Sequence, residues 1–199
     1  MTHVPTSERE RMLSGEPYNS RDPELLALAH RAREHLARLS SIPSTDSAAR
    51  FAVLRDLFAH VADGVWIEPP FFCDYGRNIS IGAGTFVNVN CVFLDSAEIR
   101  IGANVLFGPG VQLLTATHPL RAEERILPPE QRLPEQAPYR TQARPIVIGD
   151  NVWIGAATLV FPGVTIGKGT SIGAGSLVTT DIPANCLALG QPCRVQRRL

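Results

Sequence analysis

The sequence has no excess of charge, no long apolar run and almost no lysine. Its 199 residues carry 19 basic and 19 acidic side chains, so the formal net charge at pH 7 is zero. Proteins that bind nucleic acid need a basic excess to contact phosphates, which argues against that class here. No apolar stretch approaches the roughly 18 residues of a membrane span, and the polar start is unlike a signal peptide. We therefore expect a cytoplasmic protein with no nucleic-acid or membrane partner.

The sequence also lacks the cysteine spacing that binds metals. Its four cysteines, Cys73, Cys91, Cys186 and Cys193, form no C-x-x-C pair and no cluster with histidine. Without an export signal they are expected to be reduced thiols, and no metal is required. A hydrophobic share of 44% with 19% charged residues is typical of an ordinary globular protein with a real core.

Residues 1–64 are predicted to form an N-terminal helical segment. Asp22, Pro23 and Glu24 are typical of a helix start, because Asp caps free amides and Pro fits the first turn. An apolar stripe at three- and four-residue steps follows: Leu25, Leu28, Ala32, Leu36 and Leu39. A second stripe ends at Asp63-Gly64. Helices this short need a larger body to pack on.

From residue 65 the hydrophobic pattern repeats every six residues. The repeated positions are all apolar and form three runs with six-residue steps: Ile81, Val87 and Phe93; Ile101, Phe107 and Leu113; and Ile148, Ile154, Val160, Ile166, Ile172 and Val178. A period of six fits neither a helix nor an alternating strand, but it fits a three-sided prism with six residues per side. Residues 65–199 are therefore predicted to form a left-handed parallel β-helix, so the fold class is mainly β. About four coils are expected, with an excursion loop over about 115–145.

His118 is the main candidate for chemistry, because His3, His30, His35 and His60 fall in the helical stretch. It follows Thr117 where the chain leaves the repeat, and Pro119 restricts its backbone. It is either a solvated loop residue or a general base that takes a proton from an attacking alcohol.

Other polar or exposed residues have two interpretations each. Asn88 and Asp95 either turn corners of the prism or hydrogen-bond sugar hydroxyls. Trp153 either covers a seam between subunits or lies against a cofactor arm. Arg194 and Arg197 either belong to a solvated tail or bind phosphates.

Taken together, these motifs resemble the hexapeptide-repeat acyltransferases, in particular the maltose and galactoside O-acetyltransferase branch with the nodulation-factor acetyltransferases. The likeness rests on SERERMLSGEPYN at the start, then E-P-P-F, C-D-Y-G and T-A-T-H-P, and it spans nearly the whole chain. It implies transfer of an acetyl group from acetyl-CoA to a hydroxyl of a sugar, and a homotrimer with active sites between subunits.

The resemblance also implies residue roles. His118 falls on the catalytic histidine, and Asn88 and Asp74 fall on acceptor-binding positions, with Asp95 nearby. The amide of Ala156 would face the thioester oxygen. The positions that fall on the CoA groove are Ala174, Thr179, Thr180, Arg194 and Arg197, with Trp153 beside them.

Three departures from the family pattern bear on substrate choice. Thr180 stands where a lysine is common, and Asn19-Ser20 replaces an acidic residue. The loop from His118 to Pro145 is also about ten residues longer than usual. Alternatives to a sugar O-acetyltransferase are the same chemistry on a xenobiotic alcohol, an inactive scaffold, or a carbonic anhydrase. The last needs three histidines around zinc, and the β-helix region has one.

Overall fold

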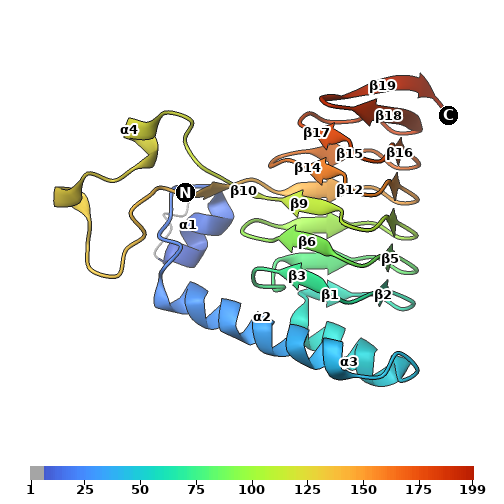
Figure 1. Ribbon diagram of the computed structural model, residues 1–199, viewed down its shortest axis with the longest axis horizontal. Coiled ribbons are helices and arrows are strands. Elements are labelled where there is room, and N and C mark those ends of the chain that lie inside the picture. Colours follow the sequence, from blue (N-terminus) through green and yellow to red (C-terminus); the bar gives the residue numbers. More distant parts are fainter. Residues whose placement is uncertain (1–6) are drawn as a thin grey trace, which may run out of the picture.

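The computed structural model describes residues 7–199, so His3 lies outside the described part. Its main body is a stack of coils with three faces built from short strands (Figure 1). Face 1 contains β1 (His60–Val61), β4 (Ile79–Ile81), β7 (Ile99–Ile101), β12 (Ile146–Ile148) and β15 (Thr165–Ile166). Face 2 contains β2 (Trp66–Ile67), β5 (Phe86–Val87), β8 (Leu106–Phe107), β13 (Trp153–Ile154), β16 (Ser171–Ile172), β18 (Cys186–Gly190) and β19 (Cys193–Arg198). Face 3 contains β3 (Phe71–Cys73), β6 (Cys91–Leu94), β9 (Gln112–Leu114), β14 (Leu159–Val160) and β17 (Leu177–Val178).

The predicted parallel β-helix is confirmed. Every neighbouring pair in the three faces is parallel except β18–β19, an antiparallel hairpin that ends the stack. All twelve repeat positions named above are buried, as are the positions two residues earlier in the last six repeats. A further coil, β1 to β3, precedes those repeats, so His60 belongs to the β-helix and not to the helical stretch.

Two corners of the prism matter for the site. The Asn88 corner joins face 2 to face 3 and carries Asn88, then Gly108 in the next coil, then Ala156 and Ala174 in the two coils after it. A backbone hydrogen bond from Gly175 N to Ala156 O (2.8 Å) joins the last two of these turns. The Asp74 corner joins face 3 to face 1 and carries Asp74, Asp95 and Thr179. Each strand of face 3 therefore runs from the Asn88 corner to the Asp74 corner.

The N-terminal helices close one end of the β-helix. α2 (Pro23–Ser41) and α3 (Ser47–Leu57) lie across the bottom of the stack in Figure 1. Asp22 caps α2 as predicted, since its side chain accepts a hydrogen bond from Glu24 N. Leu36, Leu39, Leu54 and Leu57 share one apolar core with the strands. The helical stretch is thus a lid on the β-helix core.

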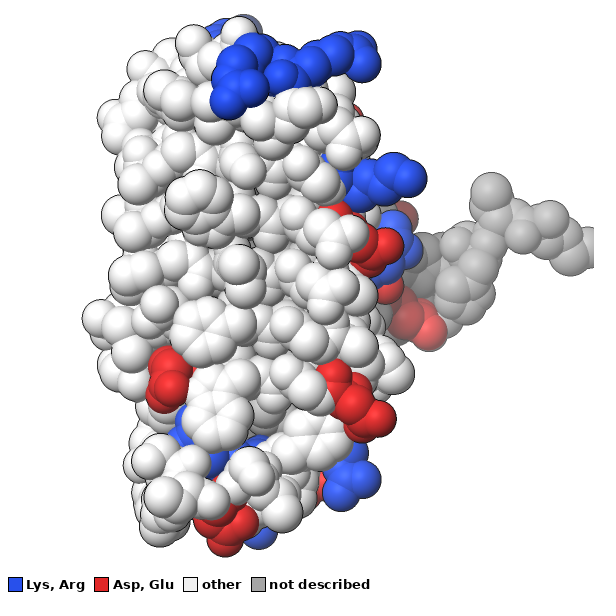
Figure 2. All heavy atoms as spheres, turned by 90° about the vertical axis from the view of Figure 1, so that its right-hand side faces the viewer, with Lys and Arg blue, Asp and Glu red and all other residues white. Residues whose placement is uncertain are grey.

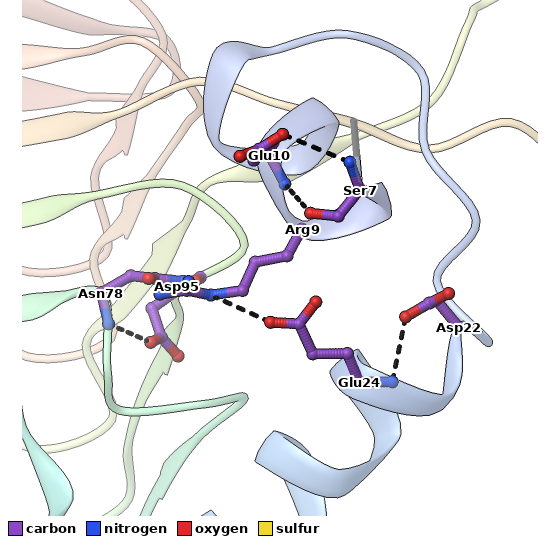
Figure 3. A network of polar contacts seen from close by, with 7 residues as sticks. All are labelled: Ser7, Arg9, Glu10, Asp22, Glu24, Asn78 and Asp95. Atoms are coloured by element: carbon purple, nitrogen blue, oxygen red, sulfur yellow. Dashed lines mark hydrogen bonds and ion pairs between the residues drawn. The ribbon is translucent and has the colours of Figure 1, made fainter. Parts of the chain in front are cut away.

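α1 (Glu8–Ser14) lies against the side of the stack, where the excursion loop also leaves it (Figure 1). Ser7 and Glu10 form a capping box at its start, and Gly15 ends it with a left-handed φ of 82°. Figure 3 shows this start beside the Arg9–Glu24 ion pair (3.9 Å) and the Asn78–Asp95 contact. α1 therefore lies next to the Asp74 corner.

The predicted excursion loop is an ordered projection with a closed base. β10 (Ala116–Thr117) and β11 (Gln142–Ala143) pair antiparallel where it leaves and rejoins the stack. The loop contains α4 (Ala122–Arg125) and a short 3₁₀ turn, η1 (Pro129–Gln131). Within residues 7–199, no helix is long and apolar enough to cross a bilayer.

Candidate active site

His118 is exposed at the base of the excursion loop, and the loop itself fixes its ring. Nδ1 lies 2.8 Å from the carbonyl oxygen of Arg140, and the ring of Tyr139 meets the imidazole edge-on with centroids 5.4 Å apart. A carbonyl can only accept a hydrogen bond, so in the neutral ring the proton lies on Nδ1 and the lone pair on Nε2. This is the tautomer that a general base needs.

A cavity of about 240 Å³ adjoins the two residues that hold His118. It lies between the N-terminal segment and the excursion loop, and both supply its walls: Glu8, Arg11, Pro17, Tyr18, Asn19, Leu127, Gln136, Tyr139 and Arg140. Two contacts join these walls, from Tyr18 N to Thr141 O (3.2 Å) and from Ala137 N to Asn19 Oδ1 (3.1 Å). The cavity is therefore built by one chain.

Asp74 lies close to this cavity, at a corner that α2 holds in place. The guanidinium of Arg33 donates to the carbonyl oxygens of Cys73 (3.1 Å) and Asp74 (2.7 Å). Burial and the neighbouring Asp95 raise the pKa of Asp74 to about 6, although Arg33 opposes the shift. Burial likewise raises the pKa of Tyr18, whose hydroxyl bonds to Ser96 and feels the charge of Asp74. Asp74, Tyr18 and Ser96 thus form one polar group beside the cavity.

Asp95 lies too deep for the acceptor contact suggested for it, which is a correction to that prediction. It is fully buried, and its carboxylate accepts hydrogen bonds from Tyr75 N (2.8 Å) and Asn78 N (3.2 Å). The Asn78 side chain donates in turn to the Asp95 carbonyl at 2.6 Å. Burial raises the pKa of Asp95. Its carboxylate therefore shapes the turn that presents Asp74.

Asn88 lies on a different corner from His118. Its side-chain oxygen accepts a hydrogen bond from Val89 N at 2.8 Å, so its amide hydrogens remain available to a ligand. The four residues of β6 lie between the Asn88 corner and the Asp74 corner, and they span about 13 Å at the usual rise of a strand. Within one chain, Asn88 and His118 do not meet.

Three of the residues suggested for CoA binding lie close together. Trp153 lies on face 2 with 55% of its surface exposed, and Ala156 and Ala174 follow on the Asn88 corner. Among the described residues, neither the Ala156 N–H nor the Ala174 N–H donates a hydrogen bond. A row of two free amides beside an exposed indole is suited to a thioester oxygen and an extended arm.

The suggested phosphate contacts divide between two places. Arg194 and Arg197 lie on β19. Arg197 pairs with Leu187, which pairs with Ser171, and Ser171 pairs with Trp153. Arg197 and Trp153 therefore lie in one row across face 2. Figure 2 shows the uncharged middle of the side where β5 and β16 lie, with Lys and Arg gathered at the end formed by β18 and β19. Thr179 and Thr180 are exposed after β17, at the Asp74 corner, away from this row.

No sequence motif indicates some residues of the site. Arg140 acts on His118 through a backbone carbonyl, which no side-chain motif can indicate. Tyr18 and Tyr139 are brought together by the folding of the loop onto the N-terminal segment. Tyr75, by contrast, is buried against Met12, Tyr18 and Leu25 and serves packing. Among residues 7–199, no group of three His, Cys, Asp or Glu side chains could hold a metal.

Two family models match parts of the chain. The family described as "Maltose acetyltransferase hexapeptide capping motif" matches residues 11–62, and "Bacterial transferase hexapeptide (six repeats)" matches residues 145–180. Nodulation protein L of Rhizobium meliloti is 43% identical, over 96% of this chain and 98% of its own length.

Solved structures match over almost the whole chain. A maltose O-acetyltransferase from Clostridium difficile has a TM-score of 0.88 at 37% identity, covering 98% of both chains. A galactoside acetyltransferase in complex with coenzyme A has a TM-score of 0.86 at 35% identity, covering 98% of this chain and 92% of the other.

The β-helix and these matches first define a class: the protein is a hexapeptide-repeat acetyltransferase. Within that class, the chain belongs to the maltose and galactoside O-acetyltransferase family, as its helical start and its T-A-T-H-P segment suggested.

Proposed function

We propose that this protein transfers the acetyl group of acetyl-CoA to a hydroxyl of a sugar, with His118 as the general base. The observation that carries the proposal is the Nδ1 contact of His118 with the Arg140 carbonyl, which leaves Nε2 free to accept a proton. The polar cavity beside His118, with Asp74 and Tyr18 close by, supports a hydroxyl-rich acceptor. The coenzyme A complex of a similar acetyltransferase supports the donor.

The reaction is a direct attack. Nε2 of His118 takes the proton of the acceptor hydroxyl as its oxygen bonds to the thioester carbonyl carbon. The negative charge on the carbonyl oxygen is stabilised by the Ala156 N–H, which has no partner among the described residues. The C–S bond then breaks, and the thiolate of CoA receives the proton from His118.

The acceptor and the donor would be held by residues of two subunits of a homotrimer. Asn88 and His118 lie on opposite edges of face 3, so one chain does not place both on a single acceptor. A neighbouring copy would bring its Asn88 corner, with Ala156 and Ala174, to the His118 of this chain. Asp74 would contact the acceptor from the side of His118, while Trp153 and Ala174 would bind the CoA arm. Arg194, Arg197, Thr179 and Thr180 would lie along the CoA groove, with the two arginines toward its phosphates.

The test is the release of CoA thiol from acetyl-CoA in the presence of sugars. We expect release that depends on the acceptor for gluco- or galactosides and is absent with acetyl-CoA alone. Thiol release at one rate whatever sugar is added would mean thioester hydrolysis and would contradict the proposal. If the protein binds acetyl-CoA tightly but releases no CoA thiol with any of these sugars, the sugar acceptor is likewise ruled out.

A further inference from the structure

A second cavity, which we call the Arg77 cavity, lies on the opposite side of α1 from the cavity beside His118. Its volume is about 360 Å³, and it opens between the end of α1, the link from α3 to β1 and the first residues of face 1. At about 100° per residue, Leu13 lies across the helix from Glu8 and Arg11. Leu13 lines the Arg77 cavity, whereas Glu8 and Arg11 line the other one. The two cavities share no lining residue, so they are separate.

One part of the wall of the Arg77 cavity is apolar. Leu13 is 42% exposed at the end of α1, Ala59 and Pro145 are also exposed, and Ala97 is buried. A ligand that covers these side chains removes apolar surface from water, which stabilises the bound state. The cavity therefore favours a ligand with an apolar body.

The other part of the wall carries polar groups that have no partner in the described chain. The half-buried Arg77 makes no hydrogen bond or ion pair with residues 7–199, and neither does the hydroxyl of Ser80 on β4. Asn78 between them differs, because both its backbone and its side chain are tied to Asp95 (Figure 3). The cavity therefore offers a ligand the guanidinium of Arg77 and one hydroxyl.

The charge around this cavity is positive. The carboxylate of Glu98, which is part of the wall, is paired with Arg100 at 3.1 Å. The charge of Arg77 has no such counterion, and its field reaches α2: burial lowers the pKa of His35, and Arg77 lowers it further, although Asp56 opposes the shift. An anion that enters the cavity therefore meets an uncompensated positive charge.

The backbone at the cavity limits the kind of anion. Three amides of the wall already donate hydrogen bonds, from Ala59 N to Ile79 O (3.0 Å), from Ala97 N to Thr115 Oγ1 (2.9 Å) and from Asn78 N to Asp95 Oδ2 (3.2 Å). A phosphate group is usually bound by several free amides at once, and this wall does not provide them. One guanidinium matches the two oxygens of a carboxylate.

We propose that the Arg77 cavity binds a small organic monocarboxylate. The carboxylate pairs with Arg77 and accepts a hydrogen bond from the Ser80 hydroxyl, and its aliphatic or aromatic body lies against Leu13, Ala59 and Pro145. The volume of about 360 Å³ is near the lower end of the ~300–1,000 Å³ of ligand pockets, which suits one ring or a short chain. This inference does not depend on the proposed acetyl transfer.

The first measurement is a calorimetric titration of the purified protein with hexanoate and benzoate, beside hexanamide and benzamide as neutral analogues of the same shape. We expect at least one carboxylate to bind with a Kd of about 1 mM or below, as suits a ligand of this size. Its amide should bind at least about 10-fold more weakly, because the ion pair is lost. No saturable binding of either carboxylate, or equal binding of acid and amide, would overturn the proposal.

Competition then separates this cavity from other anion sites of the protein. Saturating CoA should leave carboxylate binding unchanged, and inorganic phosphate at matched ionic strength should not displace the carboxylate. Displacement by CoA would place the ligand at the donor site, and displacement by phosphate would mean a general anion site. Either result would contradict a carboxylate site at Arg77.

Arg77→Gln assigns the charge. The variant should weaken carboxylate binding by about 10-fold or more, because the guanidinium pairs with both oxygens. It should fold normally, since Arg77 makes no hydrogen bond or ion pair within residues 7–199. Arg21→Gln is the matched control: Arg21 is exposed and lies outside the cavity, so its loss should leave the Kd unchanged. Equal weakening in the two variants would show a general charge effect and contradict the site.

Ala59→Leu assigns the apolar body. Ala59 is exposed, and its backbone bond to Ile79 O is kept by any side chain, so the variant should fold while its larger side chain fills part of the cavity. We expect carboxylate binding to weaken by about 5-fold or more. Ala37→Leu, at an exposed position of α2 outside the cavity, should bind as wild type does. A carboxylate that binds Ala59→Leu with the wild-type Kd lies elsewhere, and that result would overturn the assignment.

Discussion

At the scale of single residues, two neighbouring carboxylates of the Asp74 corner have different roles. Both lie in segments rich in family motifs, so the sequence suggested an acceptor contact for each. Burial separates them: Asp95 is fully enclosed with two backbone donors, whereas Asp74 is half-buried beside the cavity. The depth of a corner residue depends on the turn around it, and a repeat pattern does not encode that turn.

Asp95→Ala should destabilise the protein by about 2–4 kcal/mol, because two buried amides lose their acceptor. Urea unfolding followed by circular dichroism measures the change. Asp63→Ala is the control, since Asp63 is exposed in a turn and its side chain makes no hydrogen bond or ion pair with residues 7–199, and it should change stability by under about 0.5 kcal/mol. Equal losses in the two variants would contradict the structural role of Asp95.

Asp74 should make stability depend on pH between about 4 and 6. Its folded pKa of about 6 lies above the ordinary value of 3.8, so the folded state binds the proton more tightly than the unfolded state does. The contribution of Asp74 to stability is therefore greatest below pH 4, and it is lost as the pH rises through about 6.

Asp74→Asn removes that dependence. The difference in free energy of unfolding, variant minus wild type, should rise by about 1–3 kcal/mol from pH 4 to pH 7. Urea titration at each pH measures it. Parallel pH curves for the two proteins would show that Asp74 ionises normally in the fold.

At the scale of elements, the strands and the place of the excursion loop could be predicted, but the shape of the loop could not. A buried branched residue every sixth position fixes each strand of the β-helix, from Ile81 to Val178. The N-terminal cap was also predictable, because Asp22-Pro23-Glu24 starts α2 by local hydrogen bonding. The loop between Thr117 and Gln142 has no period, and its shape depends on contacts with residues about 120 positions away, such as Asn19 with Ala137.

Replacing residues 121–138 by a short Gly/Ser linker should leave the β-helix intact. β10 and β11 already close the base of the loop, and only Leu127 and Ala137 of the removed part are buried. We expect an unchanged far-ultraviolet spectrum, an unchanged KM for acetyl-CoA and a reduced kcat/KM for the sugar. A higher KM for acetyl-CoA with an unaffected sugar would place the loop at the donor and contradict the account.

At the scale of the whole molecule, the geometry of one chain is incomplete for the proposed reaction. His118 lies near the Asp74 corner, while Asn88, Ala156 and Ala174 lie on the Asn88 corner across face 3. The family resemblance suggested shared sites from the outset, and the separation of these corners gives that arrangement a physical reason.

Mixed oligomers test this directly. Co-expressed His118→Ala and Asn88→Ala chains should regain up to about a quarter of wild-type activity, since random assembly in a closed ring pairs an intact His118 with an intact Asn88 in that share of sites. Each variant alone should be nearly inactive. Light scattering should give the mass of a trimer. A monomeric mass, or mixed oligomers no more active than the sum of the separate variants, would contradict the shared site.

The most direct test of the central claim follows a labelled acetyl group from acetyl-CoA to the saccharide. Wild-type protein should give a saccharide with one acetyl ester, detected by mass spectrometry and NMR. His118→Ala should lower the rate by about 10²- to 10⁴-fold, the usual loss of a general base, with unchanged stability. His60→Ala, at an exposed histidine of β1, should keep the wild-type rate. An acetylated saccharide formed by His118→Ala at the wild-type rate would contradict the account.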